Sequence, residues 1–408
     1  MLEFQVVPEK SLINDDIQLV LGMSINQVIQ NLQRQFEIIH SIELSYSDKH
    51  PLAGDIVLNL RQDGIRLVFE PTTQRLKLIE VTNLSKVKLT YSGTVFCSKD
   101  VPPTRDQIDE TFGATYPGEF DADARMFHQK FRGLCFSFAA DRKAKDSNSL
   151  HSSVVSRMSI YTGTSHKDTV PPPLPLSTFG DSIFLEQLKV IRDEGQGPRN
   201  PGRTRGVQVE IVLKASYDRT NMAAKKTLKR TILFGDSVSD VVSLLGSPSK
   251  IFYKEEDKMR IHSPSATEDE TGQDLRSDYF YNYFTLGLDI LFDARRHTAK
   301  KIVLHTNFPG HYDFNIYHRC NFTMVLPSLE QGEPKVVINT FSKWDGISTR
   351  LVPPEEKPVL LNRGCSTNTT NPFGSTSCYG CCGDVIIEVI GNNNHIASVT
   401  LFDSSLPS

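Results

Sequence analysis

The stretch Gly-Leu-Asp-Ile-Leu-Phe at residues 287–292 decides the fold, because the same template occurs three times along the chain. Gly-Ile-Arg-Leu-Val-Phe at 64–69 and Gly-Leu-Cys-Phe-Ser-Phe at 133–138 repeat its first glycine, its apolar residues and its final phenylalanine. A looser fourth copy runs from Gly383 through Val389. Alternating apolar residues, followed after a polar turn by a second such run, predict a β-hairpin at each place.

A capped helix is predicted before the hairpins. Ser24 and Gln27 match a capping box, and the apolar residues that follow share one helical face. Ser237 begins an equivalent helix that ends at Gly246, and Thr104 begins another. A helix followed by a hairpin therefore recurs about four times, in two unequal pairs, which indicates duplication.

This repetition predicts an α+β protein of two lobes, each built from repeated helix and antiparallel β-hairpin units. The first lobe spans residues 1–166 and the second 206–408, because Val207–Leu213 is interpreted as the counterpart of Phe4–Val7. Residues 167–205, rich in proline and glycine, are predicted to be a linker or long loop, and residues near 263–275 a mobile insert. The helix-then-sheet unit is similar to the tandem modules of the β-lactamase-inhibitor-protein type.

Composition excludes several classes of function. The formal net charge is -3, so no overall positive field favours nucleic acid. The first residues lack a secretory signal, and no apolar run approaches the roughly 20 residues that span a bilayer. Seven cysteines in 408 residues are too sparse for a disulfide scaffold, so we expect a cytoplasmic protein with reduced thiols.

Two segments leave an enzymatic alternative open. The histidines and carboxylate between His305 and His318 could hold a metal, although their spacing matches no established ligand pattern. The cysteines from Cys365 to Cys382 include one CxxC, which could bind zinc or act as a dithiol, although no second pair accompanies it. No phosphate-binding loop or nucleophile elbow is present. We therefore expect no catalytic residue, no bound cofactor and no metal.

Other features favour binding to proteins or lipids. Pro172, Pro173 and Pro175 lie in a segment that can form a polyproline II helix for a WW or SH3 domain, or serve as a stiff linker. Trp344 is a candidate anchor for a partner, or a partly buried core residue. A basic cluster (Lys225, Lys226, Lys229 and Arg230) allows a direct phosphoinositide-binding module as a further alternative.

Several blocks resemble the phagophore assembly factor family, formerly an uncharacterised family. The resemblance spans nearly the whole chain, and these blocks carry it: Phe234–Pro248, Lys258–Pro264, Asp278–Asp293, His305–Cys320, Asn371–Thr376 and Asn393–Leu401.

The resemblance implies a non-enzymatic cytoplasmic adaptor that pairs with a WD-repeat β-propeller partner and gathers at the phagophore assembly site during autophagy. It implies that contact with the membrane is indirect, through that partner. It offers no catalytic or binding residues to transfer to this chain.

Overall fold

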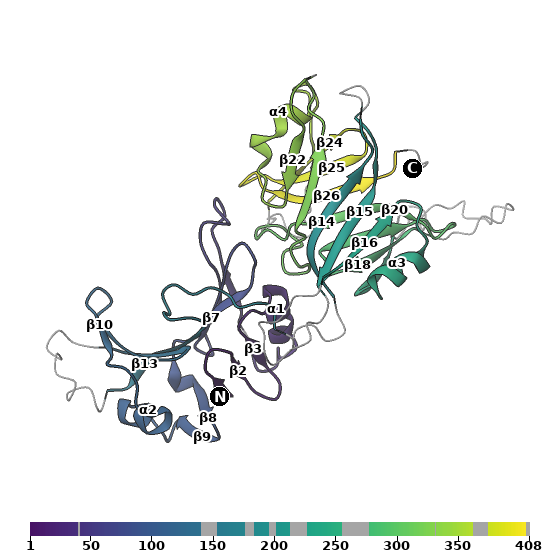
Figure 1. Cartoon of the computed structure of the whole chain (residues 1–408). Helices are drawn as coiled ribbons and strands as arrows, with labels where there is room; N and C mark the ends of the chain where they lie inside the picture. The colour runs from purple at the N-terminus through teal and green to yellow at the C-terminus, as the bar shows by residue number, and fades with distance from the viewer. Residues whose placement is uncertain are drawn as a thin grey trace, which may run out of the picture. The chain divides into compact units, whose positions relative to one another are not determined.

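The computed structural model places two compact units, Met1–Thr178 and Phe179–Ser408 (Figure 1). It describes residues 1–39, 41–139, 153–175, 183–195, 201–212, 227–254, 277–330, 332–361 and 374–404. Among these residues no helix has the length and apolar character needed to span a membrane.

The first unit contains two sheets. Its five-stranded sheet has the order β3-β2-β1-β8-β9, and its eight-stranded sheet has the order β10-β11-β12-β13-β7-β6-β5-β4. Its helices are α1 (Ile25–Gln33), α2 (Arg105–Phe112) and the 3-10 turn η1 (Leu84–Lys86). Its strands are β1 (Leu2–Val7), β2 (Ser11–Ile13), β3 (Gln18–Val20), β4 (Glu43–Ser45), β5 (Ile56–Leu60), β6 (Ile65–Phe69), β7 (Leu76–Val81), β8 (Val87–Tyr91), β9 (Thr94–Cys97), β10 (Glu119–Asp121), β11 (Met126–Phe131), β12 (Leu134–Ala139) and β13 (Val155–Tyr161).

The second unit also contains a five-stranded sheet, β16-β15-β14-β21-β22, and an eight-stranded sheet, β17-β18-β19-β20-β26-β25-β24-β23. Its helices are α3 (Val238–Leu245), η4 (Trp344–Gly346) and α4 (Ser348–Leu351). Its strands are β14 (Phe184–Arg192), β15 (Thr204–Val212), β16 (Thr227–Leu233), β17 (Lys250–Tyr253), β18 (Tyr279–Tyr283), β19 (Leu288–Phe292), β20 (Ala299–His305), β21 (Phe322–Leu326), β22 (Val336–Asn339), β23 (Val359–Leu361), β24 (Thr376–Cys381), β25 (Val385–Ile390) and β26 (Ile396–Phe402).

The two units share one topology. Adding thirteen to each strand number of the first unit reproduces both strand orders of the second. The one parallel pairing in each unit also corresponds, since β1 pairs with β8 and β14 pairs with β21, while the other described strand pairs are antiparallel. The prediction of two similar halves built from tandem modules is therefore confirmed.

Within each unit, a helical turn is tied to the last strand of a four-stranded meander. The residue before the helical turn forms a β-bridge to the residue that precedes that strand. The backbone N–H of the first helical residue then donates to the carbonyl of the residue just before that bridge partner. The four bridges are Ser24–Arg75, Thr104–Val154, Ser237–Thr298 and Lys343–His395. The same connection therefore recurs in all four predicted helix-and-hairpin units.

The template glycines are required by the hairpin turns. Gly64, Gly133 and Gly287 have φ values of 67°, 66° and 67°, which side-chain-bearing residues rarely adopt. A Cβ at Gly287 would lie 2.4 Å from the carbonyl oxygen of His318, so the backbone also approaches too closely for a larger residue. The glycine that begins each template thus fixes the start of β6, β12 and β19.

The core of the second unit lies between its two sheets. One hydrophobic cluster contains buried residues of β14, β15 and β21 from the five-stranded sheet together with residues of β19, β20, β25 and β26 from the eight-stranded sheet. Val241 and Leu245 of α3 belong to the same cluster, 0% and 3% exposed. The alternation seen in the sequence therefore points one face of each sheet into a shared core.

The fold class needs a correction, because the described residues are mainly β. The longest helix, α1, has 9 residues, and α4 has 4. In the described part of the chain each unit has thirteen strands, because a five-stranded sheet accompanies the eight strands of the two meanders. These five strands form a sheet of their own only through the pairings of β1 with β8 and of β14 with β21, which join segments far apart in the chain.

The boundary between the halves also differs from the expected one. β14 lies inside residues 167–205, predicted to be a linker, and it is the central strand of its sheet. The counterpart of β1 is therefore β14. The described part of the segment that begins at Val207 belongs to β15, the counterpart of β2, so matching that segment to Phe4–Val7 was wrong. Proline and glycine on both sides of β14 concealed it. Residues 263–275 lie outside the described residues.

Candidate functional site

Trp344 is a core residue rather than an exposed anchor. It begins η4, is 5% exposed, and its ring centroid lies 4.5 Å from that of Tyr379. It forms one wall of a cavity of about 480 Å³ that Val352, Pro353 and Pro354 also line. The indole itself is therefore held within the protein.

The proline segment packs on the first unit. A Cβ at Gly22 would lie 2.9 Å from the carbonyl oxygen of Pro172 and 2.7 Å from that of Pro173. Gly22 lies in the turn three residues before α1, so these prolines cover that turn while Pro173 stays exposed. Pro175 also lies within the described part of the segment. Recognition of Pro172, Pro173 and Pro175 by a partner stays a prediction.

His305 takes part in a buried hydrogen-bond network. Its Nε2 lies 2.9 Å from Oδ2 of Asp289 on β19. The same carboxylate accepts hydrogen bonds from the hydroxyl of Tyr317 at 2.8 Å and from the amide of Asn282 at 2.8 Å. The rings of His305 and Tyr317 are stacked, with centroids 3.8 Å apart. These contacts satisfy the carboxylate from several sides, as expected of a buried structural charge.

His311 belongs to a second network around Glu388. Nε2 of His311 lies 3.4 Å from Oε1 of Glu388. Thr376 donates to the same oxygen at 2.7 Å, and Ser398 donates to Oε2 at 2.7 Å. Burial alone would raise the pKa of Glu388, but these hydrogen bonds and His311 lower it to about 2. The carboxylate therefore stays ionised inside the protein.

The segment between His305 and His318 is thus only partly brought together. Asp313 lies between the two networks, 3.8 Å from Nδ1 of His305, and burial raises its pKa to about 6. His318 instead packs edge-on against Phe184, with ring centroids 4.9 Å apart. The histidines therefore serve mainly to hold the loop after β20 on the sheet.

Cys378 and Cys381 lie within β24 and Cys382 in the turn after it, whereas Cys365 lies outside the described residues. Burial raises the pKa of Cys381 to about 12 and also raises that of Cys382. Such thiols are protonated at neutral pH, which disfavours nucleophilic chemistry. The basic cluster is described only at Lys229 and Arg230 of β16.

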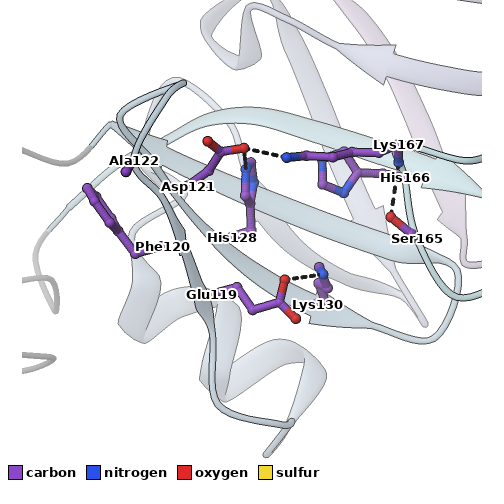
Figure 2. A pocket seen from close by; sticks show the side chains of 9 residues that line it. All are labelled: Glu119, Phe120, Asp121, Ala122, His128, Lys130, Ser165, His166 and Lys167. Atoms are coloured by element: carbon purple, nitrogen blue, oxygen red, sulfur yellow. Dashed lines mark hydrogen bonds and ion pairs between the residues drawn. The ribbon is translucent and has the colours of Figure 1, made fainter.

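A third polar cluster was not predicted from the sequence. His128 of β11, Cys135 of β12 and His166 of the loop after β13 have ligand atoms within 4.8 Å of one another. Nδ1 of His128 lies 2.9 Å from Oγ of Ser137, its cross-strand partner. The rings of His128 and His166 lie 4.8 Å apart, and Figure 2 shows them side by side. Only His128 and Cys135, seven residues apart on a hairpin, offered any signal in the sequence.

Charged pairs surround this cluster at a cavity of about 350 Å³ (Figure 2). Lys130 pairs with Glu119 at 2.5 Å, and Lys167 pairs with Asp121. Oδ2 of Asp121 lies 4.0 Å from Nε2 of His128. The backbone N–H of Ala124 and then Lys167 lower the pKa of Asp121 to about 2, so the rim carries a carboxylate beside the imidazole.

Burial sets the protonation of the cluster itself. It lowers the pKa of His128 and that of His166, and it raises the pKa of Cys135 to about 11. The two imidazoles are therefore neutral at pH 7, and Cys135 is a thiol. Neutral imidazoles are the form of histidine that can bind a metal ion.

Comparisons with known proteins agree over nearly the whole chain. A family model described as phagosome assembly factor 1, PHAF1, matches residues 15–402. A PHAF1 protein of Drosophila melanogaster is 45% identical, over 100% of this chain and 95% of its own length. PHAF1 proteins of Caenorhabditis elegans and Arabidopsis thaliana are 36% and 32% identical, over 99% and 94% of this chain and 94% and 90% of their own lengths.

No solved structure matches the chain, so the likeness to β-lactamase-inhibitor-protein modules stays a prediction. The family resemblance noted from the sequence is confirmed by the family model and by the three relatives. The chain belongs to the phagosome assembly factor 1 (PHAF1) family.

Proposed function

We propose that this chain is a non-enzymatic adaptor of autophagy that binds a WD-repeat β-propeller protein and is recruited by it to the phagophore assembly site. The observation that carries the proposal is the family match over residues 15–402, because the family is described as a phagosome assembly factor. The cytoplasmic location and the indirect contact with membranes belong to the same proposal.

The chemistry of the described residues supports a binding role over catalysis. The carboxylates Asp289 and Glu388 are saturated by hydrogen bonds from their own unit, and the thiol of Cys381 is held protonated. Groups that are already paired in this way are poorly placed to activate a substrate.

The second unit also presents an apolar edge that suits a protein partner. β17 is an edge strand of the eight-stranded sheet, and its residues Ile251, Phe252 and Tyr253 are 43%, 49% and 62% exposed. An edge strand offers unpaired backbone groups to another chain, and exposed aromatic residues are typical of binding surfaces. We place the contact with the β-propeller partner at this edge.

Affinity capture tests this assignment. The double variant Phe252→Ser with Tyr253→Ser should retain the family fold and lose at least about tenfold in the amount of β-propeller protein captured from cells, since aromatic residues dominate protein interfaces. The control Phe36→Ser changes a residue of the first unit that is 70% exposed, and it should capture the normal amount. Equal capture by both variants would contradict the β17 assignment, and absence of the partner from the unmodified capture would contradict the adaptor function.

A further inference from the structure

The cluster formed by His128, Cys135 and His166 has the ligand types of a zinc site. Zinc is bound in proteins by imidazole nitrogen and thiolate sulfur with bonds of about 2.0–2.3 Å, which place the ligand atoms about 3.5 Å apart. The three side chains already lie within 4.8 Å of one another. An adjustment of about 1 Å would therefore bring them to a tetrahedral site.

The elements of the site are suited to that adjustment. β11 and β12 are directly paired, so His128 and Cys135 are held at a fixed separation on one face of the sheet. His166 lies in the loop after β13, where the described residues form no strand. The loop can therefore close on the sheet while the hairpin stays unchanged.

His166 also has a group that the protein leaves unsatisfied. Its Nδ1 is buried and makes no hydrogen bond within the described residues. A buried polar atom without a partner costs free energy, on the order of 1–3 kcal/mol. A metal ion bound to this nitrogen would remove that cost.

The orientation of His128 points to the same conclusion. Ser137 occupies its Nδ1 at 2.9 Å, which leaves Nε2 available, directed to Asp121 at 4.0 Å. Metal-binding histidines commonly have their second nitrogen fixed by a hydrogen bond of this kind. Ser137 therefore serves as the residue that positions the imidazole.

We propose that the first unit binds one Zn²⁺ through His128, Cys135 and His166, with Asp121 as the fourth ligand. Cys135 releases its proton to solvent when the metal binds, and Asp121 exchanges Lys167 for the metal. One thiolate and one carboxylate then balance the two charges of the ion. Lys167 can leave because its side chain is 59% exposed.

Two lysines near the site oppose a cation, but Lys167 moves into solvent when Asp121 binds the metal, and Lys130 has a carboxylate of its own. Lys130 stays paired with Glu119 at 2.5 Å when the metal binds. Four protein ligands leave no open position, so the site is structural rather than catalytic. Its effect is to fasten the loop after β13 to the sheet. The mixture of imidazole and thiolate favours zinc over calcium or magnesium, which prefer oxygen ligands.

Metal analysis and cobalt spectroscopy of the full chain test the proposal. Protein purified without chelator should contain about one zinc per chain. After removal of the metal, titration with Co²⁺ alone should produce a thiolate-to-cobalt absorption band and tetrahedral d–d bands. Added Zn²⁺ should displace the cobalt and raise the melting temperature.

Variants locate the site. Cys135→Ser should abolish the thiolate band, and His166→Ala should weaken zinc binding by at least about tenfold, since ligands are needed together. Because Cys135 is fully buried, His166→Ala in the loop carries the test if Cys135→Ser fails to fold. The matched controls Cys97→Ser and His50→Ala, from the same unit, should bind zinc normally.

Two results would overturn the proposal. One is wild-type protein that contains no zinc and gives no thiolate-to-cobalt band. The other is binding that survives His166→Ala but is lost on Cys378→Ser with Cys381→Ser, which would assign the metal to the cysteines of the second unit instead.

Discussion

At the scale of residues, the two units carry different chemistry at the same place. Ser137 and Glu388 are each the fourth residue of equivalent strands, β12 and β25. Ser137 contacts His128, whereas Glu388 contacts His311, Thr376 and Ser398. The duplicated sheet thus supplies one buried polar position, and each unit uses it differently.

The polar sites were predicted only in part from the sequence, because their members come from segments far apart in the chain. His305 and His311 were recognisable as a cluster because they are close in sequence, but their carboxylate partners Asp289 and Glu388 come from strands 16 and 77 residues away. His166 lies far from His128 in the chain and reaches it only through a loop that folds back on the sheet. The spacing of residues in the sequence does not reveal such contacts between distant segments.

The network around Glu388 predicts a dependence of stability on pH. Its pKa falls from an ordinary 4.5 to about 2 on folding, so its contribution is complete above pH 4.5 and is lost as pH falls towards 2. That difference corresponds to roughly 3 kcal/mol. Chemical denaturation between pH 5 and 3 should therefore give a steeper loss of stability for the wild type than for Glu388→Gln.

The variant Glu43→Gln is the control for this measurement, since Glu43 is paired on the surface with Arg61. It should keep the pH dependence of the wild type. Parallel pH profiles for wild type and Glu388→Gln would show that the Glu388 carboxylate is not stabilised by folding.

At the scale of elements, the sequence was most informative about helix caps, which depend only on nearby residues. Ser237 and Asp240 form the complete capping box of α3, and Thr104 accepts a hydrogen bond from the backbone of Gln107 at the start of α2. The box predicted at α1 is incomplete, because Ser24 donates to the side chain of Gln27 and caps no backbone group. Strand pairing was less predictable, since β1 and β14 each pair with a strand far along the chain.

Helix α3 provides a stability prediction. Leu245 is 3% exposed and shares a core cluster with Leu288, Ile290 and Phe292 of β19. Leu245→Ala should lower the free energy of unfolding by roughly 2–5 kcal/mol, because it removes buried methyl groups and leaves a cavity. Ser243→Ala, at an exposed position of the same helix, should change it by less than about 0.5 kcal/mol.

Urea denaturation followed by circular dichroism measures both variants. An unchanged midpoint for Leu245→Ala would mean that this face of α3 is not packed on β19, and the face would then be available to a partner.

At the scale of the whole molecule, duplication was visible and its boundary was not. The template glycines and capped helices revealed two similar halves because turns and caps depend on nearby residues. The true start of the second unit was hidden, since β14 stands between two proline-rich and glycine-rich stretches and is recognised as a strand only through its pairing with β15 and β21. Family membership then points to a role in phagosome assembly, which neither strand order nor composition indicates.

The role of the whole molecule as a recruited adaptor is tested most directly by imaging the tagged chain in cells depleted of the β-propeller partner. The formal net charge of -3 means that no overall positive field draws the chain to anionic lipid headgroups. When autophagy is induced, the chain should stay diffuse in depleted cells and form puncta once the partner is restored. Puncta that persist without the partner, and disperse when Lys225, Lys226, Lys229 and Arg230 are replaced by Ala, would instead show direct binding to lipid.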